Sequence, residues 1–300
     1  MSELDQLEAM FRARPANLSI EQRRVACDEL AERYPTAPDV QVTPVIANGV
    51  PAEWTSTPAA RDDGVILYLH GGGFVSGSLA SHRHFVSELG RAAEMKTLAL
   101  EYRLAPEFPF PHALEDAING YKYLLDCSRQ VTVAGDSAGA GLAAAMLVRL
   151  RELGLPQPKG VVLFSPWADM SISADSYTRN AERDPVLNRE LMQFLAAQYL
   201  AGQPRNTPLA SPAFADLRGI APLTIFVGAT ETLLDDAIAL ARSATLADVQ
   251  VRLEIWPKMF HFWPNYYPQL AEGKNALDMA GTILRQAVST KLISRPHALA

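Results

Sequence analysis

From Val65 onward, short β-rich runs alternate with longer segments of helical period, and this alternation restricts the fold more than any other feature of the chain. Most of the short runs carry apolar residues on both faces, which is typical of strands buried on both sides. Such strands, separated by helices, predict an α/β fold with a mostly parallel central sheet that helices cover on both sides. The expected strands are Val65–His70, Thr97–Tyr102, Val131–Gly135, Val161–Pro166, Leu223–Gly228 and Val251–Trp256, and the expected helices include Ser81–Met95, His112–Leu125 and Ala138–Leu153.

Two stretches depart from this alternation. The first fifty residues read as helical and then irregular: Ser19 and Gln22 have the spacing of a capping box, which predicts a helix that runs toward Tyr34. The segment Asp169–Pro212 contains one helical piece, Asn188–Leu200, and no convincing strand. Because it is too long for an ordinary connection, it is either a lid-like insertion or a mobile loop.

The charge and the apolar runs exclude some classes of protein. The formal net charge of −6 disfavours nucleic-acid binding, because phosphate recognition needs clustered Lys and Arg, and it does not favour acidic substrates either. The amino end, Met1–Asp5, is acidic and lacks the basic start and apolar stretch of a secretory signal, so we expect a cytoplasmic protein. The apolar run Ala138–Val148 is shorter than the roughly 20 residues that a spanning helix needs, so no stable membrane insertion is expected.

One serine stands between two glycines where an expected strand gives way to a helix. In Gly135-Asp-Ser137-Ala-Gly139 it occupies the centre of a G-x-S-x-G pattern, which places a hydroxyl at a sharp strand-to-helix turn. Glycines suit the flanking positions because a Cβ there would collide with the neighbouring strand or helix. A glycine-rich turn with a capping serine is the alternative. The strand before the pattern and the small residues after it favour Ser137 as a catalytic nucleophile.

A serine hydroxyl is a poor nucleophile unless a base removes its proton, and that base is usually a histidine oriented by a carboxylate. With this turn, the order along the chain is serine, acid, histidine. His261 and His297 follow Ser137, and since His297 lies in the terminal tail, His261 is the expected base. Glu231 is the first carboxylate after the fifth expected strand and is chosen as the acid over Asp235, which suits the amino end of a helix.

A glycine run, His70-Gly-Gly-Gly-Phe74, directly follows the first expected strand. It lacks the Gly-Lys-Ser/Thr of a phosphate loop, and no G-x-G-x-x-G fingerprint follows it, which argues against nucleotide binding. Its better use is to present backbone N–H groups to the alkoxide of a tetrahedral intermediate, where one donor is worth about 3 kcal/mol. Gly72 and Gly73 are the expected donors, and Ala138, at the start of its helix, is a third. A flexible connection is the alternative.

Together these motifs resemble those of the hormone-sensitive-lipase-like carboxylesterases, also called bacterial family IV esterases, a branch of the α/β-hydrolase fold. The matching segments follow one another in the same order and span most of the chain from Val65 to the final helix. They are His70-Gly-Gly-Gly-Phe74, Tyr102-Arg-Leu-Ala-Pro-Glu107 with Phe108-Pro-Phe-Pro111 after it, Gly135-Asp-Ser-Ala-Gly139, and Phe260-His261-Phe-Trp263. The chain departs from the pattern at the acid, where many relatives read Asp-Pro-Leu and this sequence reads Glu231-Thr-Leu233.

The resemblance implies an α/β-hydrolase catalytic domain in residues 51–168 and 213–300, with a helical cap formed by residues 1–50 and by the insertion 169–212. It also implies hydrolysis of small-molecule carboxylic esters with short to medium acyl chains through an acyl-enzyme on Ser137, without a cofactor or a metal. Lactone or amide hydrolysis stays open, because the same acyl chemistry serves all three bonds. An alternative of another class is a small-molecule receptor; plant gibberellin receptors are similar to these esterases but have lost the catalytic histidine, which this chain retains.

Some aromatic and histidine residues allow two interpretations. Phe74, Phe262 and Trp263 are candidates for the substrate pocket, and ordinary packing is the alternative. His82 and His84 could suggest a metal-binding pair, but no third ligand accompanies them. We therefore interpret them as part of a solvated helix face.

Four other residues are interpreted as structural. Arg103 and Glu107 of the second motif are expected to form an ion pair and a turn. Cys27 and Cys127 are too few for a disulfide framework and lack neighbours at metal-site spacing, so both are expected to pack. The sequence leaves the oligomeric state open, and a homodimer is compatible with it.

Overall fold

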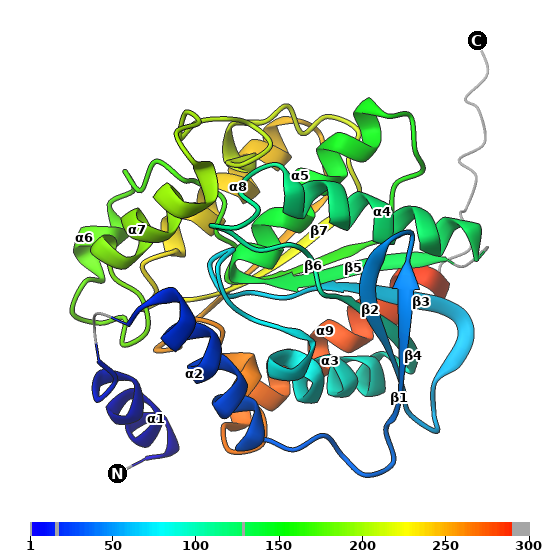
Figure 1. The fold of residues 1–300 in the computed structure, drawn as a ribbon, viewed down its shortest axis with the longest axis horizontal. Coiled ribbons are helices and arrows are strands. Elements are labelled where there is room, and N and C mark those ends of the chain that lie inside the picture. The colour runs from blue at the N-terminus through cyan, green and yellow to red at the C-terminus, as the bar shows by residue number, and fades with distance from the viewer. Residues whose placement is uncertain (1, 16–17, 128–129, 290–300) are drawn as a thin grey trace.

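The computed structural model describes residues 2–15, 18–127 and 130–289, which are built around one eight-stranded sheet (Figure 1). Its strands are β1 (Gln41–Ala47), β2 (Val50–Ser56), β3 (Arg61–Leu69), β4 (Met95–Leu100), β5 (Val131–Asp136), β6 (Val161–Phe164), β7 (Leu223–Gly228) and β8 (Val251–Trp256). The strand order across the sheet is β1-β2-β4-β3-β5-β6-β7-β8. Strands β3 to β8 are parallel, and β2 is antiparallel to both β1 and β4, so the mostly parallel sheet is confirmed.

Helices cover both faces of this sheet, as the sequence predicts. They are α1 (Glu3–Arg12), α2 (Ile20–Glu32), α3 (Leu79–Ala93), α4 (His112–Asp126), α5 (Ser137–Glu152), α6 (Ser176–Arg179), α7 (Arg189–Leu200), α8 (Leu234–Leu246) and α9 (Ala271–Ser289), with short 3-10 turns at Pro212–Phe214 and Trp263–Tyr266. Helices α3 and α9 lie on one face, and α4, α5 and α8 lie on the other (Figure 1). Within residues 2–15, 18–127 and 130–289, no helix has both the length and the apolar character needed to cross a membrane.

Strand β3 shows why an apolar run is covered on both sides. Val65, Leu67 and Leu69 are buried in the core beneath α4, α5 and α8, whereas Ile66 and Tyr68 are buried in the core beneath α3 and α9. Successive side chains of a strand point to opposite faces, so a strand that is apolar at every position needs a cover on each face.

The six expected strands are present, and β1 and β2 are two strands that the sequence did not predict. They form an antiparallel hairpin at one edge of the sheet, turning at Asn48 and Gly49. Most side chains of β1 are exposed, and Pro44 and Pro51 stand in the hairpin, so it lacks the pattern of a buried strand. The assignment of all of residues 1–50 to a helical cap is therefore wrong for β1, which belongs to the sheet.

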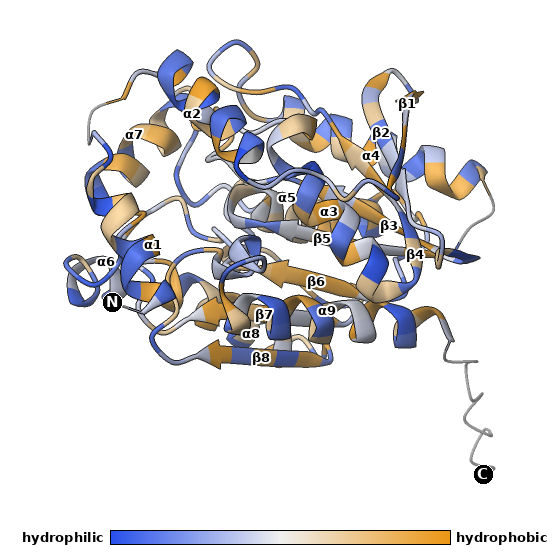
Figure 2. Ribbon diagram, turned by 90° about the horizontal axis from the view of Figure 1, so that it is seen from below, coloured by the Kyte–Doolittle hydropathy of each residue, from blue (hydrophilic) through white to orange (hydrophobic). Residues whose placement is uncertain are grey.

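Helices α1, α2, α6 and α7 gather at one end of the molecule, beside the carboxyl ends of the parallel strands (Figure 2). We call these four helices the cap. The capping box before α2 is present, since Gln22 N donates to Ser19 Oγ and Ser19 N donates to Gln22 Oε1. The long insertion carries α6 and α7, and Asn188 caps α7 by accepting a hydrogen bond from Leu191 N.

Candidate active site

Ser137 stands where β5 passes directly into α5. Its φ of +52° lies in the left-handed region, so the chain bends sharply at the carboxyl edge of the sheet. The flanking glycines permit this approach of helix to strand. A Cβ on Gly139 would lie 2.1 Å from the carbonyl oxygen of Leu69, and a Cβ on Gly135 would lie 2.8 Å from the same atom. The strand-to-helix turn expected from the G-x-S-x-G pattern is therefore present.

Glu231 and His261 meet at the same edge of the sheet, because they follow the neighbouring parallel strands β7 and β8. His261 Nδ1 lies 3.0 Å from Glu231 Oε2, and both residues are buried. When the carboxylate accepts a hydrogen bond from Nδ1–H, Nε2 becomes the proton acceptor of the ring. Asp235, the alternative acid, instead forms an ion pair with Arg179 of α6.

Burial and the partner's charge act in opposite senses on this pair. Burial raises the pKa of Glu231, and the hydrogen bond from His261 offsets only part of that rise. Burial lowers the pKa of His261, but the hydrogen bond and the charge of Glu231 outweigh burial, so the pKa of His261 lies above its ordinary value. The carboxylate thus favours the imidazolium that forms whenever the ring takes a proton.

Ser165, which no sequence motif marked as a site residue, holds the acid in place. It directly follows β6 and has a φ of +48°. Its hydroxyl donates to Glu231 Oε1 at 2.8 Å and accepts from Phe262 N at 3.1 Å, while Gly228 N, at the end of β7, also donates to Glu231 Oε1. The glutamate side chain therefore folds back to the end of its own strand, where two donors fix it. The position of Ser165 directly after a buried strand was the signal that could have found it.

The cap insertion also holds the loop that carries the acid, through two residues that the sequence analysis missed. Asn180 Nδ2 donates to the carbonyl oxygen of Glu231 at 2.7 Å. Asp184 accepts hydrogen bonds from the amide and the hydroxyl of Thr232. No motif in the insertion pointed to either residue, because both act through contacts far away in the sequence.

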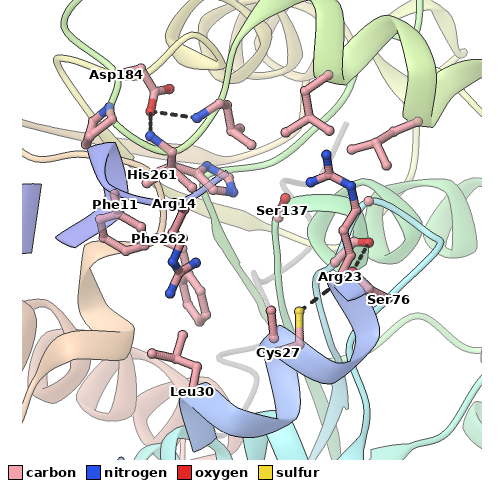
Figure 3. Close-up of a pocket in the computed structure, with 18 of the residues that line it drawn as sticks. Phe11, Arg14, Arg23, Cys27, Leu30, Ser76, Ser137, Asp184, His261 and Phe262 are labelled. Atoms are coloured by element: carbon pink, nitrogen blue, oxygen red, sulfur yellow. Dashed lines mark hydrogen bonds between the residues drawn. The ribbon is translucent and has the colours of Figure 1, made fainter. Parts of the chain in front are cut away.

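Ser137 and His261 both line a cavity of about 600 Å³ that the cap borders (Figure 3). Among the described residues, no hydrogen bond joins Ser137 Oγ to the His261 ring, an arrangement that is common before a substrate binds. The structure thus brings the three predicted residues to one site, with Glu231 and His261 in contact and Ser137 at the same cavity. His297, the rejected candidate base, lies outside the described residues.

The glycine run borders the cavity beside Ser137. Gly72 and Gly73 line it, with φ values of +114° and +65°. Neither amide donates a hydrogen bond to a described residue. Ala138 N lies in the first turn of α5, where an amide has no partner within the helix. Three amides at or next to the cavity are therefore available to donate to an oxyanion.

Asp136 fixes the glycine run relative to Ser137, the residue that follows it in the chain. Its Oδ1 accepts hydrogen bonds from Gly71 N at 2.9 Å and from the Tyr68 hydroxyl at 2.8 Å, and His82 Nε2 lies 3.5 Å from the same oxygen. Burial opposes the charge of Asp136, but His82 and the Tyr68 hydroxyl outweigh burial, so the pKa of Asp136 lies below its ordinary value. A buried carboxylate therefore ties the start of the glycine run to the serine turn.

His70 and Tyr102 hold the other side of this run. The Tyr102 hydroxyl donates to the carbonyl oxygen of His70 at 2.6 Å, and the two rings stack with centroids 4.3 Å apart. His70 Nδ1 lies 2.7 Å from the carbonyl oxygen of Gly71. Burial lowers the pKa of His70 to about 3, so the ring stays neutral and Nδ1 donates.

Of the three aromatic residues expected to line the substrate pocket, one lines the cavity and two are buried in the hydrophobic cores. Phe262 lines the cavity, but the lining formed by the described residues includes neither Phe74 nor Trp263, so the prediction is wrong for these two. Phe74 is buried against Tyr199, with ring centroids 3.7 Å apart, and Trp263 is buried beside Trp256. Both rings are taken up by packing, which was the alternative interpretation.

The interpretation of His82 and His84 as a solvated face is wrong, because α3 packs against the sheet and against α9. His84 is buried, with Nε2 3.3 Å from the carbonyl oxygen of Asn265. His82 lines the cavity. In the part of the chain that the structure describes, no three or more His, Cys, Asp or Glu side chains are grouped so that they could hold a metal ion.

Arg103 and Glu107 are structural, but each pairs with a different partner. Arg103 forms an ion pair with Asp116 of α4, and Glu107 forms one with Arg24 of α2. Cys127 is exposed, so its expected packing role is wrong.

Comparison with known proteins identifies the family of this chain. Residues 66–265 match the family model described as alpha/beta hydrolase fold. The chain is 45% identical over 279 residues to an acetyl-hydrolase of Streptomyces hygroscopicus, which covers 92% of this chain and 93% of that protein. Its fold is similar to the crystal structure of an esterase from the bacterial hormone-sensitive lipase family, with a TM-score of 0.93 and 44% identity over 95% of this chain and 98% of that chain. It is equally similar to EstE5 soaked with p-nitrophenyl butyrate, with a TM-score of 0.93 and 41% identity over 96% of this chain and 99% of that chain. The chain therefore belongs to the α/β-hydrolase fold family and, within it, to the bacterial hormone-sensitive-lipase branch of esterases.

Proposed function

We propose that this hydrolase cleaves carboxylic esters with short to medium acyl chains through an acyl-enzyme, with Ser137 as nucleophile, His261 as base and Glu231 as the acid that orients the base. The observation that carries the proposal is the buried contact of 3.0 Å between His261 Nδ1 and Glu231 Oε2 at the cavity that Ser137 also lines. A serine at a strand-to-helix turn, facing such a pair, is the arrangement that acyl transfer requires.

In the first half of the proposed reaction, Ser137 Oγ attacks the ester carbonyl carbon while His261 Nε2 takes the hydroxyl proton. The carbonyl oxygen becomes an alkoxide, to which the amides of Gly72, Gly73 and Ala138 donate. When the intermediate collapses, the bond to the alcohol oxygen breaks, and His261 returns the proton to the leaving alcohol. In the second half, a water molecule attacks the acyl-enzyme by the same route and releases the carboxylic acid and the free serine.

The size of the cavity and the names of the relatives support the substrate class. A volume of about 600 Å³ is in the range of sites for small molecules, which is roughly 300–1,000 Å³. One relative is named an acetyl-hydrolase, and the crystals of a solved relative were soaked with p-nitrophenyl butyrate. Acetyl and butyryl are both short acyl groups. The retained pair of His261 and Glu231 disfavours a receptor without catalysis, whereas lactones and amides remain compatible with the same triad.

Serine-directed labelling and ester kinetics test this proposal. A fluorophosphonate should label the wild-type protein and fail to label Ser137→Ala, while Ser76→Ala, which removes another serine of the cavity lining, should keep the label. Rates for p-nitrophenyl acetate, butyrate and octanoate should be abolished in Ser137→Ala and should fall from the short to the long acyl chain in the wild type. Labelling or turnover that survives in Ser137→Ala would refute the assignment of the nucleophile.

Two further expectations accompany this function as proposals. The chain is expected to work in the cytoplasm on a small-molecule ester, without nucleic acid or stable membrane insertion. A homodimer stays compatible with the sequence, and size-exclusion chromatography with light scattering would determine the oligomeric state.

A further inference from the structure

The turn of residues 180–184, which joins α6 to α7 in the cap, is bonded to the loop that carries Glu231. Asn180 Nδ2 donates to the carbonyl oxygen of Glu231 at 2.7 Å. Asp184 Oδ2 accepts from the amide and the hydroxyl of Thr232, at 2.8 Å and 3.2 Å. Asn180 and Asp184 are both buried. The cap therefore grips the chain at the proposed acid and at the residue that follows it.

Hydrogen bonds within the turn orient its two buried side chains. The backbone amides of Arg183 and Asp184 both donate to the carbonyl oxygen of Asn180, at 2.9 Å. Arg183 Nη1 donates to Asn180 Oδ1 at 2.9 Å, which directs the amide nitrogen of Asn180 toward Glu231. Asp184 Oδ1 accepts from the amides two and three residues further on, which leaves Oδ2 for Thr232. A shift of the turn would therefore move both of its contacts with the acid loop together.

Helix α1 contacts this turn and also the segment that carries the base. Arg12, the last residue of α1, donates from Nη2 to the carbonyl oxygen of Glu182 at 3.0 Å. Phe11 is buried and packs edge-on against Phe260, with ring centroids 5.3 Å apart. Phe260 directly precedes His261 in the chain. The end of α1 therefore meets the supports of both members of the proposed acid–base pair.

The same parts of the cap border the cavity. Phe11, Arg12 and Asp184 line the cavity that Ser137 also lines, and Figure 3 shows Phe11 and Asp184 at its wall. A substrate that fills the cavity therefore reaches α1 and the 180–184 turn as well as the nucleophile. Because reaction rates depend steeply on how a catalytic group is placed, contacts that fix the acid loop can act on the rate without touching the reacting atoms.

We propose that the 180–184 turn positions Glu231 for catalysis and that α1 holds this turn in place through Arg12. The inference rests on the proposed ester hydrolysis and adds three positioning residues, Asn180, Asp184 and Arg12, which act through Glu231. Docking of α1 at the cavity and alignment of the acid with His261 thus form one event. The cap then takes part in catalysis as well as covering the cavity.

A double-mutant cycle on Asn180 and Glu231 separates positioning from ordinary support of the fold. Asn180 is a sharper probe than Asp184, because it carries no charge and lies outside the cavity lining. In Asn180→Ala, kcat for p-nitrophenyl acetate should fall by about tenfold while KM changes little, because the acid loop loses a buried hydrogen bond and the cavity keeps its lining. In the Glu231→Ala background the same change should leave kcat almost unaltered, since no acid remains to be positioned.

The matched control for this cycle is Glu182→Ala. Glu182 belongs to the same turn, and its exposed side chain takes no part in the hydrogen bonds described above. This variant should keep the parent rate in both backgrounds. The inference is wrong if Asn180→Ala keeps the wild-type kcat, or if it causes the same loss with and without Glu231, which is the additivity of two independent sites.

Hydrogen exchange tests the link to α1 without a substrate. Arg12→Met removes a donor at an exposed position, so the variant should fold. Exchange of the amides of residues 229–235 should become about fivefold faster, because opening of the acid loop no longer requires the hydrogen bond from Arg12 to break. Exchange in α9 should stay unchanged. Gln6→Met, at another exposed position of α1, is the control, and mass spectrometry after pepsin digestion measures both segments.

Equal exchange of the acid loop in Arg12→Met and Gln6→Met would overturn the link between α1 and the acid. If Asn180→Ala does not fold, Arg12→Met takes its place in the cycle, with the same dependence on Glu231 expected. If the wild type hydrolyses no ester, or if Glu231→Ala keeps the wild-type rate, the proposed function fails, whereas the link from α1 to the acid loop is still decided by exchange.

Discussion

Glu231 is the residue at which this chain departs from the pattern of its family. The side chain places Oε1 against Gly228 N and the Ser165 hydroxyl, and Oε2 against His261 Nδ1. Oε1 therefore accepts hydrogen bonds from Gly228 and Ser165, which hold the side chain in place, while Oε2 contacts the imidazole of His261. The glutamate is held by two donors at the end of its own strand, so its extra length does not leave it loose.

Replacing this carboxylate should change both the rate and its pH dependence. In Glu231→Gln, kcat/KM should fall by about 10²- to 10⁴-fold, because the imidazole loses the group that orients it and stabilises its charge. Glu231 raises the pKa of His261, and in the proposed mechanism the neutral ring is the active form. The acid limb of the pH profile should therefore move to lower pH in the variant.

The pH profile of kcat/KM from pH 4 to 9 measures this shift. The matched control is Glu190→Gln, which removes an exposed glutamate of α7 and should leave both the rate and the profile unchanged. An acid limb at the same pH in Glu231→Gln and in the wild type would show that Glu231 does not control the protonation of the base.

At the scale of elements, α2 is attached to the catalytic core through Arg24. Its Nε donates to the carbonyl oxygen of Val75, and its Nη2 donates to the carbonyl oxygen of Ala105. Its guanidinium also forms a bidentate ion pair with the carboxylate of Glu107. Arg24 lowers the pKa of Glu107 to about 2. Val75 follows the glycine run, and Ala105 and Glu107 belong to the second motif of the family resemblance, so one residue of the cap contacts both motifs.

Removing this attachment should loosen α2 without unfolding the protein. In Arg24→Gln, hydrogen exchange of the amides of Ile20–Glu32 should become about tenfold faster, because opening of this helix no longer breaks hydrogen bonds to a charged group. Exchange in α9 should stay unchanged. Mass spectrometry after exchange and pepsin digestion measures both helices, with Arg33→Gln as the control. Equal exchange of α2 in the two variants would contradict this role.

At the scale of the whole molecule, His84 packs among segments from both ends of the chain. Its ring stacks on Tyr34, with centroids 5.5 Å apart, and on Tyr267, with centroids 6.1 Å apart. Its Nε2 lies 3.3 Å from the carbonyl oxygen of Asn265. Burial lowers the pKa of His84 to about 4, so the folded protein keeps this ring neutral at pH values where an unfolded histidine is charged.

The free energy of unfolding should therefore decrease as the pH falls from about 6.5 toward 4. The unfolded chain binds the proton first, and at pH 5 this difference costs about 2 kcal/mol of the free energy of unfolding. In His84→Gln the loss of stability between pH 7 and pH 5 should be smaller by that amount, whatever the stability of the variant at pH 7. Urea unfolding at the two pH values measures the loss, and an equal loss in both proteins would contradict the assignment.

Local pattern alone determined much of this protein. The runs that are apolar on both faces became strands because such a strand has few stable places outside a covered sheet. Strand β8 is the exception, since it lies at the edge of the sheet and none of its side chains is fully buried. Chain order then led to Glu231 and His261, because parallel strands deliver the residues that follow them to one edge. The glycines around Ser137 indicated the bend, since the close approach of α5 to β3 excludes a Cβ at Gly139.

Only the tertiary structure decided which distant groups support the proposed triad and which charged side chains line the cavity. Ser165 and Asn180 act on Glu231 through contacts with residues that lie 66 and 51 positions away, and no local pattern encodes such a distance. The exposed strand β1 paired with β2 at the sheet edge, where burial does not impose an apolar pattern. Arg14 and Arg23 reached the cavity because the cap lies over the carboxyl ends of the strands, so the local charge there differs in sign from the charge of the whole chain.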